Sequence, residues 1–543
     1  MIEPAQPVTV LRGGRVFTAA PAGWAEAVAY RGTRIEAVGT NSELLDRFPN
    51  ARQIDVGGRT VLPGLIDAHN HFLATGESLA AVDARYPDVA SIEDLVRALA
   101  GAATIAPPGA WVTAFGFDDA KYEASLTRWD LDRAAADRPI GVYHVSGHHV
   151  VVNSRALADR GLAETTPDPP GGRLVRDDGR LNGWCLDAAM NLILPVAVDI
   201  GSHGPNFHTV TTLDASVAAV ERAAHAFLAA GLTTVCDAQV TSRELAAYRE
   251  ADRRHTLGVR TVCMPLSHQL ETFRALGLTG PFGDDRLRIG ALKIYADGSL
   301  IGGTAAFAEP YGEQGEFVGS MYRSPAELRE LIVAAHLDGW QIGVHVQGDR
   351  AMTAVLDGLE AAVAAAPRDH RHRLEHAGYP TPALLERIAG LGAITVNQTN
   401  YLFGSGDEFL VRLGERAHGL MPLRDELAAG IRVVLSSDSD VTSYRPLDTI
   451  RSATERRTRS GAPIGANQAL TLEEALRAHT ITAAFALGME ERIGSLETGK
   501  LADIVVVDGD LPAAQDIAGL GVWLTVLDGQ VEHAVEPSLV DAR

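Results

Sequence analysis

Cysteine is scarce in this sequence, with 3 among 543 residues. Cys185, Cys236 and Cys263 lie far apart along the chain, and no Cys-x-x-Cys pair occurs. Because disulfide frameworks and thiolate metal sites both need clustered cysteines, the sequence supports neither.

Long apolar runs and an N-terminal targeting segment are also missing. No apolar stretch approaches the roughly 18 residues that a membrane-spanning helix needs. Residues 1–7 carry neither the basic region nor the apolar region of a signal peptide. We therefore expect a cytoplasmic protein with no membrane as partner.

Basic residues are fewer than acidic ones: the sequence has 48 Lys and Arg and 69 Asp and Glu, so its formal net charge is −21. Nucleic acids and anionic membranes attract basic surfaces, so this balance argues against both as partners. The length of 543 residues exceeds one ordinary domain. We expect a large enzyme core with accessory domains.

The two ends of the chain have the texture of β-structure. Short apolar segments separated by glycine turns run from about residue 8 to residue 61, and they return in residues 502–508 and 522–529. We predict a small β-sandwich domain that is built from both termini, residues 1–61 and 491–543.

Strand and helix patterns alternate through the middle of the chain, which is typical of a parallel sheet. Eight strand candidates occur there, the number that closes a barrel. They are Leu62–His71, Leu232–Asp237, Val259–Pro265, Leu287–Ala296, Gln341–Gln347, Arg371–Gly378, Ala393–Thr399 and Arg432–Asp438. The predicted fold class is α/β, a TIM-like (β/α)8 barrel formed by residues 62–75 and 206–490.

One connection is much longer than an ordinary βα repeat. The 160 residues between His71 and Leu232 compare with about 30 in such a repeat. We predict that residues 76–205 form an inserted α/β domain. Because this insertion follows the first barrel strand, it should emerge at the catalytic face and cap the active site.

Two histidines end the first predicted strand. His69 and His71 are spaced i, i+2, so both imidazoles leave the same face of the strand. Two such imidazoles make half of a transition-metal site. The alternative is a pair of core histidines that are satisfied by hydrogen bonds.

Other ligand-type side chains fall at predicted strand ends as well. Strand four contains Lys293, strand five ends in His345, strand six in His376 and strand eight in Asp438. The carboxyl ends of barrel strands meet at one face, where barrel enzymes carry their active sites. The pattern therefore predicts a divalent metal site. Zinc is the default metal for histidine-rich sites with a carboxylate, and manganese, iron and nickel are alternatives.

Several longer motifs support this interpretation. They are Gly64–His71, Gly147–His148 followed by Val152–Leu157, Asp297–Leu300, His345–Ala351 and Ile493–Asp503. With these motifs the chain resembles the amidohydrolase superfamily over nearly its whole length. It is most similar to amidohydrolase family 3, which includes N-substituted formamide deformylases.

The resemblance implies two metals, with His345 and His376 on the second one and a carboxylated Lys293 as the bridge. The full implied ligand set is His69, His71, Lys293, His345, His376 and Asp438. Burial favours the carboxylation because it depresses a lysine's pKa and leaves a neutral amine.

A site with one metal is the alternative to the bridged pair. In that version Lys293 stays charged and orients the substrate, while His376 polarises the reacting group. The single metal would then be held by His69, His71, His345 and Asp438.

The chemistry that follows is hydrolysis. A metal lowers the pKa of its bound water to about 7 and polarises a carbonyl. Asp438 is our candidate for the general base that accepts the proton and the acid that returns it to the leaving amine, with His376 as the second catalytic candidate. We predict cleavage of the C–N bond of a linear N-acyl or N-formyl compound. The alternatives on the same site are hydrolysis of a cyclic amide, a carbamate or an ester, and deamination; a non-catalytic scaffold is disfavoured because no ligand is missing.

Substrate contacts are the least constrained part of the prediction. The candidates are His148, Asp297, Phe117 and Trp184. Their structural alternatives are a buried loop histidine, an Asp-Gly turn and two core aromatic residues. We expect a small-molecule substrate, and the family resemblance suggests a homodimer.

Overall fold

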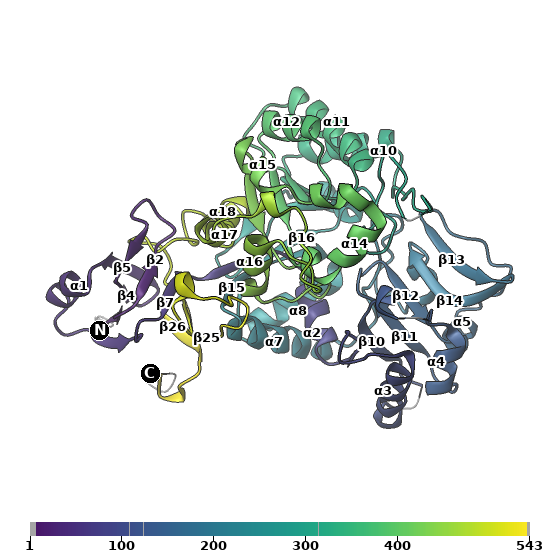
Figure 1. Ribbon diagram of the computed structural model, residues 1–543, viewed down its shortest axis with the longest axis horizontal. Coiled ribbons are helices and arrows are strands. Elements are labelled where there is room, and N and C mark those ends of the chain that lie inside the picture. Colours follow the sequence, from purple (N-terminus) through teal and green to yellow (C-terminus); the bar gives the residue numbers. More distant parts are fainter. Residues whose placement is uncertain (1–6, 108, 123, 313, 540–543) are drawn as a thin grey trace.

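The computed structural model of this chain describes residues 7–107, 109–122, 124–312 and 314–539. Figure 1 shows strands from both termini at one side, a helix-covered barrel in the middle and a second strand-rich region at the other side. Within the described ranges, no helix is long and apolar enough to cross a membrane.

Parallel strands make the centre of the molecule. β8, β15, β16 and β18 pair side by side, and β19 to β23 pair in chain order. Nearly every residue of these strands is buried, as expected for parallel strands covered on both faces. Their bounds are β8 Leu65–Asn70, β15 Leu232–Val240, β16 Arg260–Pro265, β18 Leu287–Ile289, β19 Leu292–Tyr295, β20 Ile342–Val346, β21 Arg373–His376, β22 Ile394–Asn397 and β23 Arg432–Leu435.

Two predicted strands are each divided by a glycine. The segment Leu62–His71 contains the end of β7 (Thr60–Pro63), which belongs to another sheet, and β8. At Gly64 between them, a Cβ atom would lie 2.2 Å from Oγ1 of Thr233, so the chain needs glycine there. The fourth predicted strand is divided at Gly290 into β18 and β19.

Two seams close the strands into a ring. At the first, the Gly290 N–H donates to the Cys263 carbonyl at 2.8 Å, which joins β16 to the β18–β19 segment. At the second, the Asp438 N–H donates to the His69 carbonyl at 2.9 Å. These contacts link the end of β23 to β8, so two of the predicted metal ligands lie on the seam that closes the barrel.

Helices cover the outside of the ring (Figure 1). Local sequence explains their boundaries, as in α10, where Ser324 caps the helix, Pro325 opens it and Glu327 returns the capping-box hydrogen bond. The main helices are α7 Leu213–Ala229, α8 Ser242–Arg253, α9 Leu270–Leu276, α10 Pro325–Leu337, α11 Asp349–Ala365, α12 Pro382–Leu391, α15 Leu423–Ala428, α16 Pro446–Glu455, α17 Leu472–Ala478 and α18 Ile481–Ala486.

Strands from the two ends of the chain share one sheet. Its order is β26-β25-β24-β7-β2-β3, and a four-stranded sheet has the order β5-β4-β1-β6. Apolar residues of both sheets, among them Leu11, Val28 and Leu524, pack in one buried cluster. The bounds are β1 Val8–Arg12, β2 Arg15–Phe17, β3 Trp24–Ala25, β4 Ala27–Arg31, β5 Arg34–Gly39, β6 Arg52–Asp55, β24 Ile504–Val507, β25 Val522–Leu527 and β26 Gln530–Ala534.

The long connection after β8 folds around its own sheet, which has the order β13-β14-β12-β11-β10-β9. This sheet has its own buried apolar clusters and lies next to the barrel in Figure 1. The elements are α2 Phe72–Ser78, β9 Val82–Asp83, α3 Ile92–Ile105, β10 Val112–Phe117, α4 Arg128–Ala134, β11 Ile140–His144, β12 His149–Val152, α5 Ser154–Asp159, β13 Gly172–Asp177 and β14 Arg180–Asp187.

A buried glutamate on α15, Glu426, is expected to make the stability depend on pH. Oε2 of Glu426 accepts hydrogen bonds from Thr395 Oγ1 at 2.6 Å and Asn397 Nδ2 at 3.1 Å, and burial raises its pKa to about 7. The folded state therefore binds the proton of Glu426 more tightly than the unfolded state does. The contribution of this group to the free energy of unfolding is fully present below pH 4.5 and is lost as the pH rises through 7.

Glu426→Gln should remove this pH dependence, because a glutamine carries no charge to bury. Above pH 7 the variant should have a larger free energy of unfolding than the wild type, by on the order of 1–3 kcal/mol, and should therefore unfold at a higher urea concentration. The measurement is urea unfolding across the range from pH 5 to pH 8. If the difference in free energy of unfolding between wild type and variant does not change with pH, Glu426 does not have the raised pKa assigned to it.

Candidate metal centre and active site

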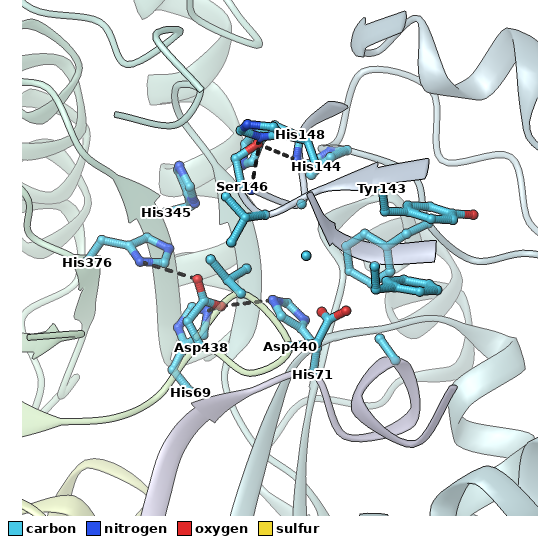
Figure 2. A pocket seen from close by; sticks show the side chains of 18 of the residues that line it. His69, His71, Tyr143, His144, Ser146, His148, His345, His376, Asp438 and Asp440 are labelled. Carbon is cyan, nitrogen blue, oxygen red and sulfur yellow. Dashed lines mark hydrogen bonds and ion pairs between the residues drawn. The ribbon is translucent and has the colours of Figure 1, made fainter. Parts of the chain in front are cut away.

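A cavity lies at the carboxyl ends of the barrel strands, between the barrel and the inserted sheet. Figure 2 shows barrel residues on one side and residues of the insertion on the other. The barrel side includes His69, His71, Tyr295, His345, His376, Tyr401 and Asp438, and the insertion contributes Phe115, Tyr143, His144, Ser146 and His148.

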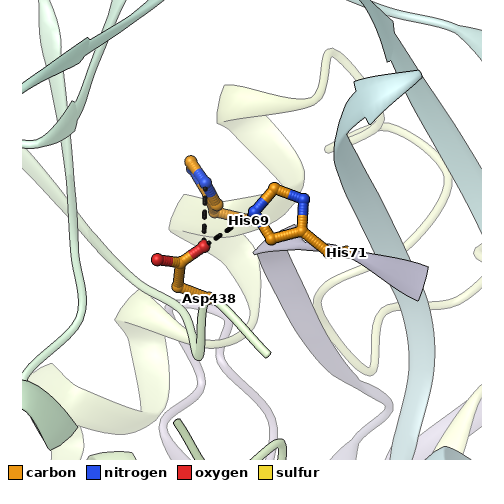
Figure 3. Close-up of side chains that lie close together, drawn as sticks. All are labelled: His69, His71 and Asp438. Carbon is orange, nitrogen blue, oxygen red and sulfur yellow. Dashed lines mark ion pairs between the residues drawn. The ribbon is translucent and has the colours of Figure 1, made fainter. Parts of the chain in front are cut away.

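Three electron-pair donors converge at the base of this cavity (Figure 3). Oδ1 of Asp438 lies 3.3 Å from Nε2 of His69 and 3.1 Å from Nε2 of His71. All three residues are buried, and their ligand atoms lie within 4.8 Å of one another. This trio forms a group that could hold a metal ion.

The tautomer of His69 is fixed by a charged neighbour. Nδ1 of His69 lies 2.6 Å from Oε2 of Glu375, whose carboxylate also binds the guanidinium of Arg373. Arg373 and His69 hold the pKa of Glu375 far below its usual range, although burial acts in the opposite direction. Nδ1 of His69 therefore donates to a carboxylate, and Nε2 is left as an acceptor.

The charges in the trio are those of a cation site. Nε2 of His69 and Oδ1 of Asp438 are both buried acceptors without a hydrogen-bond partner in the described structure. Two unsatisfied buried acceptors that face each other cost free energy, and a bound cation would satisfy both. The residues present therefore fit a divalent metal.

Two further histidines lie beside the trio. Nδ1 of His376 is 2.8 Å from the side-chain oxygen of Gln398, and Nε2 of His345 is 3.1 Å from the Gly298 carbonyl. Each histidine donates through one nitrogen and keeps a lone pair on the other. Burial lowers the pKa of both, to about 3 for His376. The two rings lie 4.4 Å apart between centroids, so a pair of neutral ligand-type imidazoles faces the same space.

Lys293 lies on β19, is 0% exposed and is not among the residues that line the cavity. Its Nζ has no hydrogen-bond partner among the described residues, and it lies 4.6 Å from the ring centroid of Tyr295. Burial lowers the pKa of Lys293 to about 8. A lowered pKa leaves more of the amine neutral than in an ordinary lysine, and the neutral amine is the nucleophilic form.

Three residues at or beside the trio have left-handed backbone conformations. His376 has φ +72°, Ala377 has φ +42° and Asp438 has φ +54°, left-handed conformations that non-glycine residues rarely adopt. Such conformations persist where the surrounding structure enforces them, and they cluster at functional sites.

The predicted substrate contacts fall in different places. His148 reaches the cavity from the insertion, and its Nδ1 lies 2.9 Å from Oδ1 of Asp187. The Asp297 carboxylate instead accepts the backbone N–H groups of Ala306, Gln347 and Gly348 at 2.8 to 3.0 Å. It therefore ties the loops after β19 and β20 together and does not line the cavity.

The two predicted aromatic contacts also lie away from the cavity. Phe117 is 0% exposed and packs in the core of the inserted sheet. Trp184 packs against it at 6.2 Å between centroids and donates from Nε1 to the Leu126 carbonyl. The aromatic wall is instead made by Phe115 and Tyr143, which stack at 4.4 Å.

Glu375 and Tyr401 belong to the site without a role predicted from the sequence. Arg373 and Glu375 share the i, i+2 spacing that places them on one face of a buried strand, a signal that could indicate the pair. The hydroxyl of Tyr401 donates to Oδ2 of Asp438. Only the fold shows that it does so.

A second group of ligand-type atoms is formed by Asp118, Asp119 and His144 in the insertion. Both ring nitrogens of His144 are occupied, one by Oδ1 of Asp119 at 2.9 Å and the other by Ser146 Oγ at 2.8 Å. This histidine has no free lone pair for a cation, so we assign the group to internal hydrogen bonding.

The fold and the site define a barrel hydrolase with a candidate metal centre, and comparison with known proteins agrees. Residues 52–533 match the amidohydrolase family. The chain is 32% identical over 525 residues to an N-substituted formamide deformylase of Arthrobacter pascens, covering 94% of this chain and 95% of the relative. The chain therefore belongs to the amidohydrolase family, whose members are hydrolases.

Solved structures with the same fold include two uncharacterized metal-dependent hydrolases. The Pyrococcus horikoshii protein has a TM-score of 0.74 at 23% identity and covers 97% of this chain and 100% of its own. The Pyrococcus furiosus protein has a TM-score of 0.72 at 26% identity, with 92% and 98% covered. These similarities agree with a TIM-barrel fold for the chain.

Replacing the carboxylate behind His69 should weaken metal binding. Glu375→Gln removes the charge that fixes the His69 tautomer, so we expect the dissociation constant for Zn²⁺ to rise by about 10- to 100-fold. Competition with a chelating dye measures it.

Glu426→Gln is the matched control, because it is the same change at another buried glutamate that does not touch the trio. If both variants bind Zn²⁺ as the wild type does, Glu375 does not support the metal centre. A thermal melt of each variant separates a loss of affinity from a loss of folded protein.

Proposed function

We propose that this chain hydrolyses the C–N bond of a linear amide, an N-acyl or N-formyl compound. The observation that carries the proposal is the trio of His69, His71 and Asp438 at the base of the cavity, where Nε2 of His69 and Oδ1 of Asp438 are acceptors without a partner in the described structure. The similarity to an N-substituted formamide deformylase supports an amide as the substrate.

The trio would hold a divalent metal, and zinc is the default for two imidazoles and a carboxylate. A metal bound there supplies a water of lowered pKa and polarises the amide carbonyl. His345 and His376 offer lone pairs toward the same space for a second metal or for the substrate carbonyl.

Asp438 is the proposed general base and acid. Its Oδ1 faces the two histidines, while Oδ2 accepts the hydroxyl of Tyr401, which fixes the plane of the carboxylate. Oδ2 keeps a second lone pair that can take a proton from the attacking water. Delivery of that proton to the nitrogen makes the amine a competent leaving group.

His148 is the proposed substrate contact from the insertion. Its Nδ1 is held by Asp187, and its ring lies 5.4 Å from that of His345 between centroids. Figure 2 places His148 across the cavity from the trio. An amide bound between the two would have its polar atoms within reach of an imidazole on either side.

We propose that Lys293 is carboxylated and bridges two metals. Its buried, unpartnered Nζ and lowered pKa support a neutral amine that adds CO₂. Lys293→Met should then reduce the bound metal from two ions per chain to one, measured by plasma mass spectrometry.

Lys293→Glu, which restores a carboxylate, should recover part of the second metal. A wild type with a single metal and no added CO₂ in its intact mass would favour the charged Lys293 and the mononuclear site.

The proposed reaction is tested with metal-loaded protein and a panel of N-formyl and N-acetyl amines, cyclic amides, carbamates, esters and aminated heterocycles. We expect the highest kcat/KM for a linear amide. Asp438→Asn should reduce it by about 100-fold or more, since the variant cannot carry the proton.

His225→Ala, on the exposed face of α7, is the control and should retain wild-type activity. A panel in which a cyclic amide, carbamate, ester or heterocycle is preferred would replace the proposed substrate class. Full activity of Asp438→Asn would contradict the role of that residue.

A further inference from the structure

A second, wider cavity continues outward from the metal centre. It shares Gly116, Val145, Tyr401 and Val441 with the inner cavity, so the two adjoin along these residues. The short helix α13 (Asn400–Gly404) places Tyr401 against Asp438 and, two residues on, Phe403 in the outer cavity. The two cavities therefore meet at Tyr401, and Phe403 lines the outer one.

Two guanidinium groups flank Phe403 in this outer cavity. The Arg451 guanidinium lies 3.9 Å from the ring centroid of Phe403, and that of Arg459 lies 5.3 Å from it. Both arginines line the cavity. Stacking on an aromatic ring fixes the direction of a guanidinium but leaves its N–H donors free.

Neither arginine of this pair has an acidic partner among the described residues. The acids of the outer cavity are engaged elsewhere: Asp448 binds Ser443 Oγ at 2.6 Å and lies 3.6 Å from Arg445. Asp118 lies 3.9 Å from Lys121, and Asp516 accepts the Gly519 N–H at 3.0 Å. Arg451 is half-buried and Arg459 is exposed, so both guanidinium groups can meet a ligand in the outer cavity.

The remainder of the outer cavity contains apolar surface. Leu79, Ile301 and Val441 line it, together with the aromatic rings of Tyr86 and Tyr444. Such a lining accepts an alkyl or aryl body, and guanidinium donors accept a planar carboxylate.

We propose that the outer cavity is a binding site for an anionic end of the substrate, with Arg451 and Arg459 binding a carboxylate that is separated from the scissile amide by an apolar body. This inference deepens the proposed amide hydrolysis and depends on it for the position of the scissile bond. The proposal also gives a role to the positive charge of Arg451 and Arg459. The overall negative charge of the chain repels anions, so a pair of cations in a cleft attracts an anionic substrate to that place.

Matched substrates test this proposal. A series of ω-formamidoalkanoates of increasing chain length is compared with N-alkylformamides that lack the carboxylate and with ω-ammonium analogues. At the best length, the carboxylate should raise kcat/KM by about tenfold or more, the size of one charge-assisted hydrogen bond. The ammonium analogue should be the poorest, and added salt should reduce the advantage.

The double variant Arg451→Gln and Arg459→Gln should lose this advantage and still cleave the uncharged amide as the wild type does. Arg432→Gln is the matched control, because Arg432 stacks on Phe485 at 4.2 Å but neither residue lines the two cavities. Equal kcat/KM for charged and uncharged amides, or the same loss in the control, would overturn the proposal.

Binding without turnover separates this inference from the proposed reaction. Isothermal titration of the metal-loaded protein with octanoate and with 1-octanol, neither of which has an amide bond to cleave, should show tighter binding of octanoate, lost in the double variant. Octanoate that binds the double variant equally well is held by the metal centre and overturns the proposal. If no amide in the panel is cleaved but octanoate binding depends on the arginine pair, the proposed reaction fails and the anionic site stands.

Discussion

The structure is organised around three buried electron-pair donors that face one another. His69 and Asp438 lie on the two strands that meet at the closing seam, and the Asp438 N–H donates to the His69 carbonyl. The backbone hydrogen bond that closes the barrel therefore also holds His69 and Asp438 next to each other. Because facing acceptors repel, this arrangement is stable only with a cation or a proton between them.

A chain of fixed charges extends from the trio into the barrel. Arg373 neutralises Glu375, and Glu375 fixes His69, so each buried charge has a partner of opposite sign. On the other side, Tyr401 holds the second oxygen of Asp438. The insertion supplies the opposite wall, and its cavity-facing histidine, His148, is anchored by its own aspartate. The barrel thus provides the reacting groups, and the insertion encloses the space in which a substrate would lie.

Much of the barrel could be predicted because its ligands end buried strands, and a strand end has a fixed direction in a parallel barrel. The sequence could not show that Gly64 and Gly290 divide two of these strands, since the reason lies in the neighbouring Thr233 and in the seam to Cys263. Asp297 and Phe117 have the residue types of substrate contacts, but backbone amides and core packing occupy them. Tyr401 and Arg451 lie on helices, and their contacts with Asp438 and Phe403 depend on how those helices pack, which no spacing in the sequence encodes. The domain boundaries, the metal identity, the homodimer and the cytoplasmic location stay predictions.

The most direct test of the central claim is a crystal structure of the zinc-loaded protein with anomalous data collected at the zinc absorption edge. The account predicts an anomalous peak bound by Nε2 of His69, Nε2 of His71 and Oδ1 of Asp438, with Nδ1 of His69 still on Glu375. A zinc-loaded crystal with no anomalous peak among these three atoms, in which Nε2 of His71 still donates a hydrogen bond to Oδ1 of Asp438, would contradict the account.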